Sequence, residues 1–211
     1  MAEFLEVEVA CEPLRLLADR AVYWPARRRL LVADLHLGKG DVFRNAGIPV
    51  PTGGTSHDLA RLGNLLRVTR ADSLWILGDF LHGAAHPAVL EAWDVFRRSQ
   101  AELSVALVRG NHDRSLDPTR SGLDELADGV RDGPFEFRHA PTSRTAGGHL
   151  LCGHVHPVAR LPGVGRAPIF WLRDQALVLP AFSRFTGGYR VDLASCSGSV
   201  VCNGTDLVRL P

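Results

Sequence analysis

The sequence predicts an α/β fold in which two mixed β-sheets pack together and helices lie outside them. Three observations support this prediction. Four apolar runs of strand length end in polar residues, helical patterns separate the first of these runs, and turn signals divide short apolar runs after Ile169. Because 211 residues with 45% hydrophobic content can bury one substantial core, we expect a single domain over residues 1–211.

The first elements of the chain are short strands. Apolar runs predict strands at residues 14–17 and 21–24, and a turn at 25–27 leads into a third strand at 29–34. A helix is expected from about Thr55, because leucines recur at helical spacing after that residue. These leucines are Leu59, Leu62, Leu65 and Leu66.

A second helix is expected at residues 87–99, between two of the apolar runs. The order strand, helix, strand, helix, strand is typical of a parallel sheet with crossover helices. The pattern changes after the third apolar run, where we expect a short helix at 122–127 and a strand at 135–139. Turn signals such as Asn203-Gly204 favour antiparallel strands in the last part of the chain.

The polar residues that end the four apolar runs are of types that bind metals. The runs are residues 30–33, 74–77, 105–108 and 150–152. They lead into Asp34, His36, Asp79, His82, Asn111, His112, Asp113, His154 and His156, with an isolated His139 before the last run. Open α/β sheets bind ligands outside the carboxyl ends of their strands, so we expect these side chains to converge. Carboxylate, amide-oxygen and imidazole donors together suit Mn²⁺, Fe²⁺ or Zn²⁺.

Each of these residues also has a plain structural interpretation. Asp34 and Asp79 could cap the helices that follow them, which is a frequent use of aspartate. A lone histidine such as His139 is more often hydrogen-bonded within the structure than bound to a metal. The combination of several motifs, rather than any one residue, favours a metal site.

The composition argues against several other classes of protein. Basic and acidic residues nearly balance, at 24 and 23, so the totals indicate no strong nonspecific attraction to nucleic acid. The cysteines form no Cys-x-x-Cys pair, which argues against a zinc ribbon or a thioredoxin-like motif. No signal peptide is visible in residues 1–12 and no run of about 18 apolar residues occurs, so we expect a cytoplasmic protein without membrane contact.

Five short motifs resemble, in kind and order, the blocks of the calcineurin-like metallophosphoesterase superfamily. They are Asp-x-His, Gly-Asp, Gly-Asn-His-Asp, a lone histidine and Gly-His-x-His, spread over residues 34–156. Longer runs at 34–40, 78–82 and 179–188 resemble the ligase-associated DNA damage response endonucleases, called PdeM-like. The chain departs from that group at Ala140, where the group carries glutamate.

The resemblance implies a four-layer α/β/β/α sandwich and a site for two divalent ions, with Mn²⁺ expected and Fe²⁺ or Zn²⁺ as alternatives. It places Asp34, His36 and His156 on one ion, Asn111, His139 and His154 on the other, and Asp79 between the two. Two such ions, about 3.5–4 Å apart, can bind phosphate oxygens and lower the pKa of a water during an in-line displacement.

Further residues are expected to act beside the ions. His112 would donate a proton to the departing oxygen or stabilise the pentavalent phosphorus through a hydrogen bond, and Asp113 would fix the tautomer of the His112 ring. Contact with the substrate is expected from side chains near the motifs, although an arginine in a loop is usually only solvated. These side chains are Lys39, Arg44, His82, Arg114 and Arg184.

The leading hypothesis is a metal-dependent phosphodiesterase. The narrower resemblance implies a DNA endonuclease of DNA repair that works alongside an ATP-dependent DNA ligase and a helicase. The alternative is a phosphatase or phosphodiesterase for nucleotides or other small phosphoesters. A binding scaffold without catalysis is disfavoured, because every expected ligand is present. The oligomeric state is left open.

Overall fold

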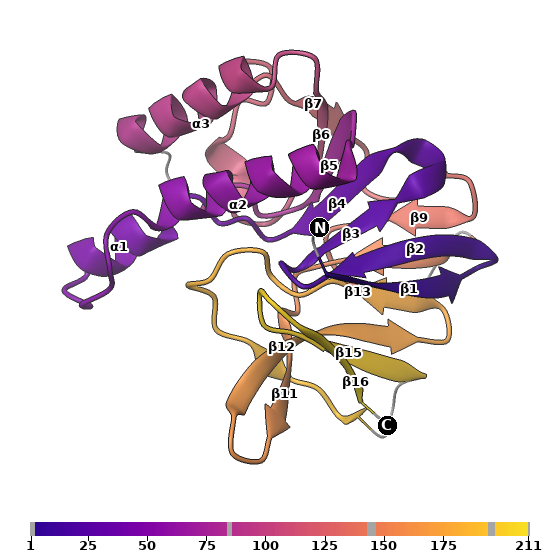
Figure 1. The fold of residues 1–211 in the computed structure, drawn as a ribbon. Coiled ribbons are helices and arrows are strands. Elements are labelled where there is room, and N and C mark those ends of the chain that lie inside the picture. The colour runs from indigo at the N-terminus through magenta and orange to yellow at the C-terminus, as the bar shows by residue number, and fades with distance from the viewer. Residues whose placement is uncertain (1–2, 84–85, 143–146, 194–196, 211) are drawn as a thin grey trace.

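Two β-sheets packed face to face form the body of the structure (Figure 1). The structure is a computed structural model, which describes residues 3–83, 86–142, 147–193 and 197–210. In the first sheet the described strands lie side by side in chain order. They are β1 (Phe4–Val9), β2 (Glu12–Leu17), β3 (Ala21–Trp24), β4 (Arg29–Ala33), β5 (Ser73–Leu77), β6 (Ser104–Val108) and β7 (Asp124–Leu126). Neighbours from β1 to β4 are antiparallel, whereas neighbours from β4 to β7 are parallel.

Helices cover the outer face of the first sheet (Figure 1). The described α-helices are α1 (Lys39–Asn45), α2 (Gly54–Thr69) and α3 (Pro87–Ser99). Leu62 of α2 and Trp93 of α3 are fully buried in one cluster with Ile76 of β5. Burial of each such side chain contributes roughly 1.5–3 kcal/mol, and this holds the crossover helices on the sheet. None of the helices formed by the described residues is long and apolar enough to cross a membrane.

The second sheet is built from the later part of the chain. Its described strands are β8 (Val130–Asp132), β9 (Phe135–Phe137), β10 (His149–Cys152), β11 (Pro157–Leu161), β12 (Gly165–Arg173), β13 (Ala176–Val178), β14 (Tyr189–Arg190), β15 (Gly198–Cys202) and β16 (Leu207–Leu210). Their order is β14-β11-β12-β13-β10-β9-β8, with β15 on β12 and β16 on β15. Strands β9, β10 and β13 are parallel neighbours, and β12, β15 and β16 are antiparallel ones.

Aromatic side chains fill the space between the two sheets. Phe135 and Phe137 of β9 are fully buried against Trp24 of β3. The ring centroids of Trp24 and Phe135 lie 4.8 Å apart in an edge-to-face arrangement, a favoured geometry for aromatic pairs. This core fixes how the ends of β4, β5 and β6 face the ends of β9 and β10.

The expected fold of two mixed sheets flanked by helices is confirmed. The predicted helix at 122–127 is wrong, because β7 forms there and pairs in parallel with β6. Leu126 lies opposite Val108 and Leu123 is buried, so pairing at the sheet edge outweighs the local helix propensity. Within the described residues every α-helix precedes residue 100, and α2 and α3 pack on the first sheet.

Candidate metal centre

The candidate site lies where strand ends from both sheets meet. In the first sheet Asp34 follows β4, Asp79 follows β5 and Asn111 follows β6. In the second sheet His139 follows β9 and His154 follows β10. Strands β4, β5 and β6 are parallel, as are β9 and β10, so their carboxyl ends come to common edges. The structure thus brings the sequence motifs together.

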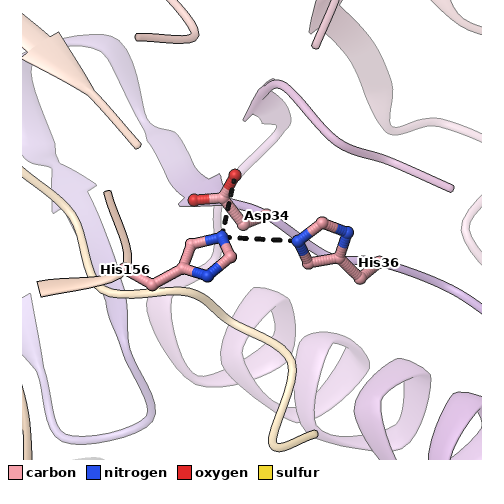
Figure 2. Close-up of side chains that lie close together, drawn as sticks. All are labelled: Asp34, His36 and His156. Carbon is pink, nitrogen blue, oxygen red and sulfur yellow. Dashed lines mark hydrogen bonds and ion pairs between the residues drawn. The ribbon is translucent and has the colours of Figure 1, made fainter. Parts of the chain in front are cut away.

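One group of donors consists of Asp34, His36 and His156 (Figure 2). The Nε2 atoms of His36 and His156 lie 3.3 Å apart, and His156 Nε2 lies 3.5 Å from Asp34 Oδ1. Asp34 and His36 are buried, whereas His156 is partly exposed. Each residue offers one donor atom, and these atoms all lie within 4.8 Å of one another. One divalent ion could therefore contact all three residues.

A second group of donors consists of Asp79, His139 and His154. His139 Nε2 lies 3.7 Å from Asp79 Oδ1 and 2.9 Å from His154 Nδ1. Asn111 joins this group, because its Oδ1 atom lies 3.0 Å from His139 Nε2. Asp79 and His139 are buried, whereas Asn111 and His154 are exposed at the mouth of the site.

Asp79 faces both groups of donors. Its Oδ1 atom points to His139, and its Oδ2 atom lies 3.8 Å from His36 Nε2 in the first group. The two groups also approach each other where His139 Nδ1 lies 3.9 Å from Asp34 Oδ1. A carboxylate whose two oxygens face different groups has the geometry needed to be shared by two neighbouring ions.

The donor set fits divalent cations. Asp34 Oδ1 is buried and has no hydrogen-bond partner among the described residues, although a buried polar atom without a partner is costly. The imidazole nitrogens of His36 and His156 face each other at hydrogen-bond distance, as do those of His139 and His154. A cation between them would satisfy the carboxylate oxygen and the nitrogen lone pairs together. Mixed oxygen and nitrogen donors of this kind suit first-row divalent ions.

The backbone at five of these residues is in the left-handed region. They are Asp34 (φ 54°), His36 (φ 45°), Asp79 (φ 46°), His154 (φ 69°) and His156 (φ 50°). Left-handed backbone at a residue other than glycine costs of order 1–3 kcal/mol, and it persists only where the surroundings impose it. Here the loop after β4 is held by the loop after β5, since His36 N donates to Asp79 O at 2.8 Å.

Two motif glycines are required by close contacts between the loops. A Cβ atom on Gly78 would lie 1.8 Å from His139 Nδ1, and φ at Gly78 is +80°. A Cβ atom on Gly153 would lie 2.5 Å from Asp34 Oδ2 and 2.5 Å from the Cβ atom of Ala33. Each glycine leaves room for a donor that comes from the other sheet.

Burial favours the neutral form of two imidazoles of the site, those of His36 and His154. It lowers the pKa of His36 to about 2, with a further contribution from the charge of Lys39. Burial and the neighbouring His139 also lower the pKa of His154. The neutral imidazole is the form that binds a metal, so these rings need not lose a proton when an ion arrives.

The structure corrects the expected role of Asp113. Its buried carboxylate accepts hydrogen bonds from Leu81 N (3.0 Å) and Gly110 N (2.9 Å), and no hydrogen bond to the His112 ring is found. The 3₁₀ turn Asp113–Ser115 directs this side chain inward, between the loops after β5 and β6. Asp113 therefore positions two loops, and the prediction that it fixes the His112 tautomer is wrong.

His112 and His82 lie beside the donors. The His112 ring stacks on the His82 ring with centroids 4.8 Å apart, and it meets the His36 ring edge-on at 5.3 Å. His82 Nδ1 lies 3.3 Å from His36 Nδ1, so His82 contacts the His36 nitrogen that does not face the donor group and can orient the ring. Burial lowers the pKa of His82 to about 4.

The basic residues expected to contact substrate are placed differently from one another. Lys39 is partly buried near Asp34 and Asp79, and burial lowers its pKa. Arg44 pairs with Asp41 in its own helix and donates to Pro51 O at 2.8 Å, so its guanidinium is already engaged. Arg114 and Arg184 are exposed. Arg184 lines a hollow together with His156, whereas no contact connects Arg114 to the donors.

The sequence analysis did not identify two arginines that hold the loop containing Phe182 and Ser183 next to the donors. Arg20 donates to Ser183 O at 3.0 Å, and Arg61 donates to Phe182 O at 3.1 Å. Phe182 N in turn donates to Ala33 O at 2.8 Å, directly before Asp34. The two arginines thus hold the loop after β13 against the end of β4. No local pattern marks them, because their partners lie more than 100 residues away.

Comparison with known proteins agrees with this geometry. The sequence profile of the calcineurin-like phosphoesterases matches residues 27–184. The nuclease MPE of Pseudomonas putida is similar at 39% identity, with 99% of this chain and all of that chain covered and a TM-score of 0.88. A comparison with functionally curated proteins gave no match.

A more distant solved structure shares the fold. It is YfcE, a phosphoesterase from E. coli, at 17% identity and a TM-score of 0.50, with 86% of this chain and 97% of that chain covered. The profile match spans all five motifs, and the motif residues form two neighbouring donor groups. The chain therefore belongs to the calcineurin-like phosphoesterase family, and its likeness to a nuclease along nearly its whole length is consistent with a PdeM-like member.

Proposed function

We propose that this protein is a metal-dependent phosphodiesterase that cuts DNA internally. The observation that carries the proposal is the pair of donor groups joined by Asp79, whose two carboxylate oxygens face different groups. Such a pair suits two ions that act on one phosphate. The 39% identity to a nuclease supports nucleic acid as the substrate class.

The proposed ligand roles follow the two groups. Asp34, His36 and His156 would hold one ion, Asn111, His139 and His154 would hold the other, and Asp79, which faces both groups, would serve both. We expect Mn²⁺ in both positions. Bound ions would supply a water of lowered pKa and would neutralise charge on the phosphate.

His112 is the proposed acid for the leaving group. Its backbone N–H donates to Asp79 Oδ1 at 2.9 Å, and its ring stacks on His82 outside both donor groups. Hydrolysis breaks the phosphorus–oxygen bond of the diester and forms a new bond from the phosphorus to a water oxygen. His112 gives a proton to the departing sugar oxygen and is reprotonated from solvent, a role typically worth about 10²–10⁴-fold in rate.

DNA is favoured over small phosphoesters by the exposure of two proposed ligands and by the 39% identity to a nuclease. Asn111 and His154 are exposed at the mouth of the site, so a polymer can pass over the donors. A role in repair, in the cytoplasm and alongside an ATP-dependent ligase and a helicase, is part of the proposal and follows from the PdeM-like motifs. Hydrolysis of nucleotides or other small phosphoesters is the alternative.

The test uses metal-stripped protein reloaded with Mn²⁺. Supercoiled plasmid, single-stranded DNA and a small phosphodiester are incubated with the wild type, with Asp79→Ala, and with Asp94→Ala as a control on the exposed face of α3. We expect nicking by the wild type and the control and none by Asp79→Ala. Hydrolysis of the small ester with intact plasmid would move the assignment to the alternative, and no hydrolysis of any ester would overturn it.

A further inference from the structure

Exposed arginines line two adjoining hollows beside the metal centre. The first hollow, of about 220 Å³, is lined by His156 together with Arg184 and Arg166. The second, of about 420 Å³, is lined by Arg166, Arg160 and Arg190. Val158 and Arg166 belong to both, so the hollows form one path that begins at a metal donor. No acidic residue is among the described residues that line either hollow.

The strands set the direction of this path. β11 begins directly after His156, and β12 pairs with it in antiparallel fashion. Arg160 lies four residues beyond His156, which is roughly 13 Å at about 3.3 Å per residue. A path of this length can contact more than one phosphate of a DNA strand. A mononucleotide bound at the donors could not reach its far end.

Within the described part of the chain, the arginines along the path have no acidic partner. Arg160 and Arg166 lie directly opposite each other on β11 and β12, an arrangement of like charges that destabilises a sheet. No ion pair between described residues includes Arg160, Arg166, Arg184 or Arg190, whereas other surface arginines have acidic partners, as Arg109 has Glu125. The net charge of the whole chain is only +1, so this is a local concentration of positive charge.

The exposed aromatic residue Tyr189, which precedes Arg190 in β14, lines neither hollow, because successive side chains of a strand point to opposite faces. Tyr189 is 66% exposed, and its backbone N–H donates to His156 O at 3.1 Å. Phe182 is buried and Phe185 packs closely over Gly54, so neither ring is available to a base. The described lining of the path therefore offers contacts to phosphates rather than an aromatic ring for stacking with bases.

We propose that the arginine track, defined as Arg184, Arg166, Arg160 and Arg190, binds the phosphate backbone of the DNA strand that is cut, to one side of the bond that is cut. This inference rests on the proposed nuclease function and extends it. The track gives the strand a fixed course from the metal centre along β11 and β12, away from α2 and α3 (Figure 1).

The binding test compares two double variants of the full chain. Arg160→Gln/Arg166→Gln removes two charges from the track, and Arg67→Gln/Arg98→Gln removes two exposed arginines from α2 and α3. Binding of a fluorescent single-stranded oligonucleotide is measured in EDTA, where no cutting occurs, at several salt concentrations. Each lost phosphate contact should reduce the slope of log K against log salt by about 0.7, and the track variant should bind about tenfold more weakly or worse at low salt.

Cleavage separates failure of the track from failure of the proposed function. With Mn²⁺, the ratio of oligonucleotide cleavage to hydrolysis of a small phosphodiester should fall in the track variant and stay constant in the control. If the wild type cuts DNA but the track variant matches the control in affinity, salt slope and cleavage ratio, the proposal that the arginine track binds DNA is wrong. If the wild type cuts only the small diester, the nuclease proposal itself fails.

Discussion

The two sheets contribute different chemistry to the candidate metal centre. The first sheet supplies both carboxylates, Asp34 and Asp79, from the loops after β4 and β5. The second sheet supplies only imidazoles, from His139, His154 and His156. Each donor group takes members from both sheets, so neither group is complete until the sheets have packed against each other.

This division places the negatively charged carboxylate donors on the first sheet and only imidazole donors on the second. The first-sheet carboxylates are almost fully buried, at 0% exposure for Asp34 and 2% for Asp79. The second-sheet histidines include His154, which is exposed at the surface. Desolvation of its ring lowers the pKa of His154 and so favours the neutral form. Loss of a buried carboxylate should therefore impair the centre more than loss of an exposed imidazole.

The largest expected effect belongs to Asp79→Asn, which keeps the shape of the side chain but removes its negative charge. In the proposed two-metal mechanism bound ions would supply several kcal/mol of transition-state stabilisation, so we expect DNA cleavage to fall by about 10³-fold or more. His154→Ala, on the second sheet, should lose less. Cleavage rates and the metal content of both variants measure the difference, and equal losses would contradict the division between the sheets.

His112→Ala sharpens the comparison within the first sheet, because His112 lies outside both donor groups. We expect kcat to fall by about 10²–10⁴-fold while the bound metal stays at the wild-type level. His57→Ala, at an exposed histidine of α2, serves as the matched control. Loss of metal together with activity would show that His112 is a ligand rather than an acid.

Metal removal tests whether ions hold the sheets together. At a Mn²⁺ concentration of about 100 times Kd, binding to the folded state alone adds about 2.7 kcal/mol of stability. For a chain of this length the midpoint of thermal unfolding should rise by about 5–10 °C over the chelated protein. Differential scanning calorimetry measures the shift, which should shrink in His139→Ala. An unchanged midpoint over a full Mn²⁺ titration would argue against metal bound across the sheets.

The smallest effect is expected from Gly153→Ala, which adds one methyl group where the second sheet approaches Asp34. The new Cβ atom would lie 2.5 Å from Asp34 Oδ2, and overpacking of this kind costs about 1–3 kcal/mol. Gly198→Ala, with no heavy atom within 4 Å of the added carbon, is the control. Urea unfolding of the metal-free proteins compares them, and equal midpoints would show that the loops can separate without cost.

The sequence was most informative where function follows directly from a strand. Asp34 and Asp79 each come after a run of buried apolar residues, and a parallel sheet necessarily collects such positions at one edge. The orientation of Asp113 could not be predicted, because it depends on the backbone of a 3₁₀ turn. The helix expected at 122–127 failed for a related reason: a partner strand, rather than local propensity, decided its conformation.

The arginines were the least predictable part of the site. Arg160 and Arg166 face each other only because a hairpin brings β11 and β12 together, and neither belongs to a recognisable motif. Arg44 follows a motif closely in sequence, yet its guanidinium is engaged by Asp41 and Pro51 O. Proximity in sequence is thus a poor guide to which basic side chains face the metal centre.

The left-handed backbone at five of the proposed metal ligands limits how this site can evolve. Among residues other than glycine, asparagine, aspartate and histidine enter this region of φ and ψ most readily, and β-branched residues rarely do. The same three residue types supply the oxygen and nitrogen donors of the centre. Backbone conformation and metal chemistry therefore favour the same three residue types. Substitutions that remove a metal ligand must also change the backbone conformation of its loop.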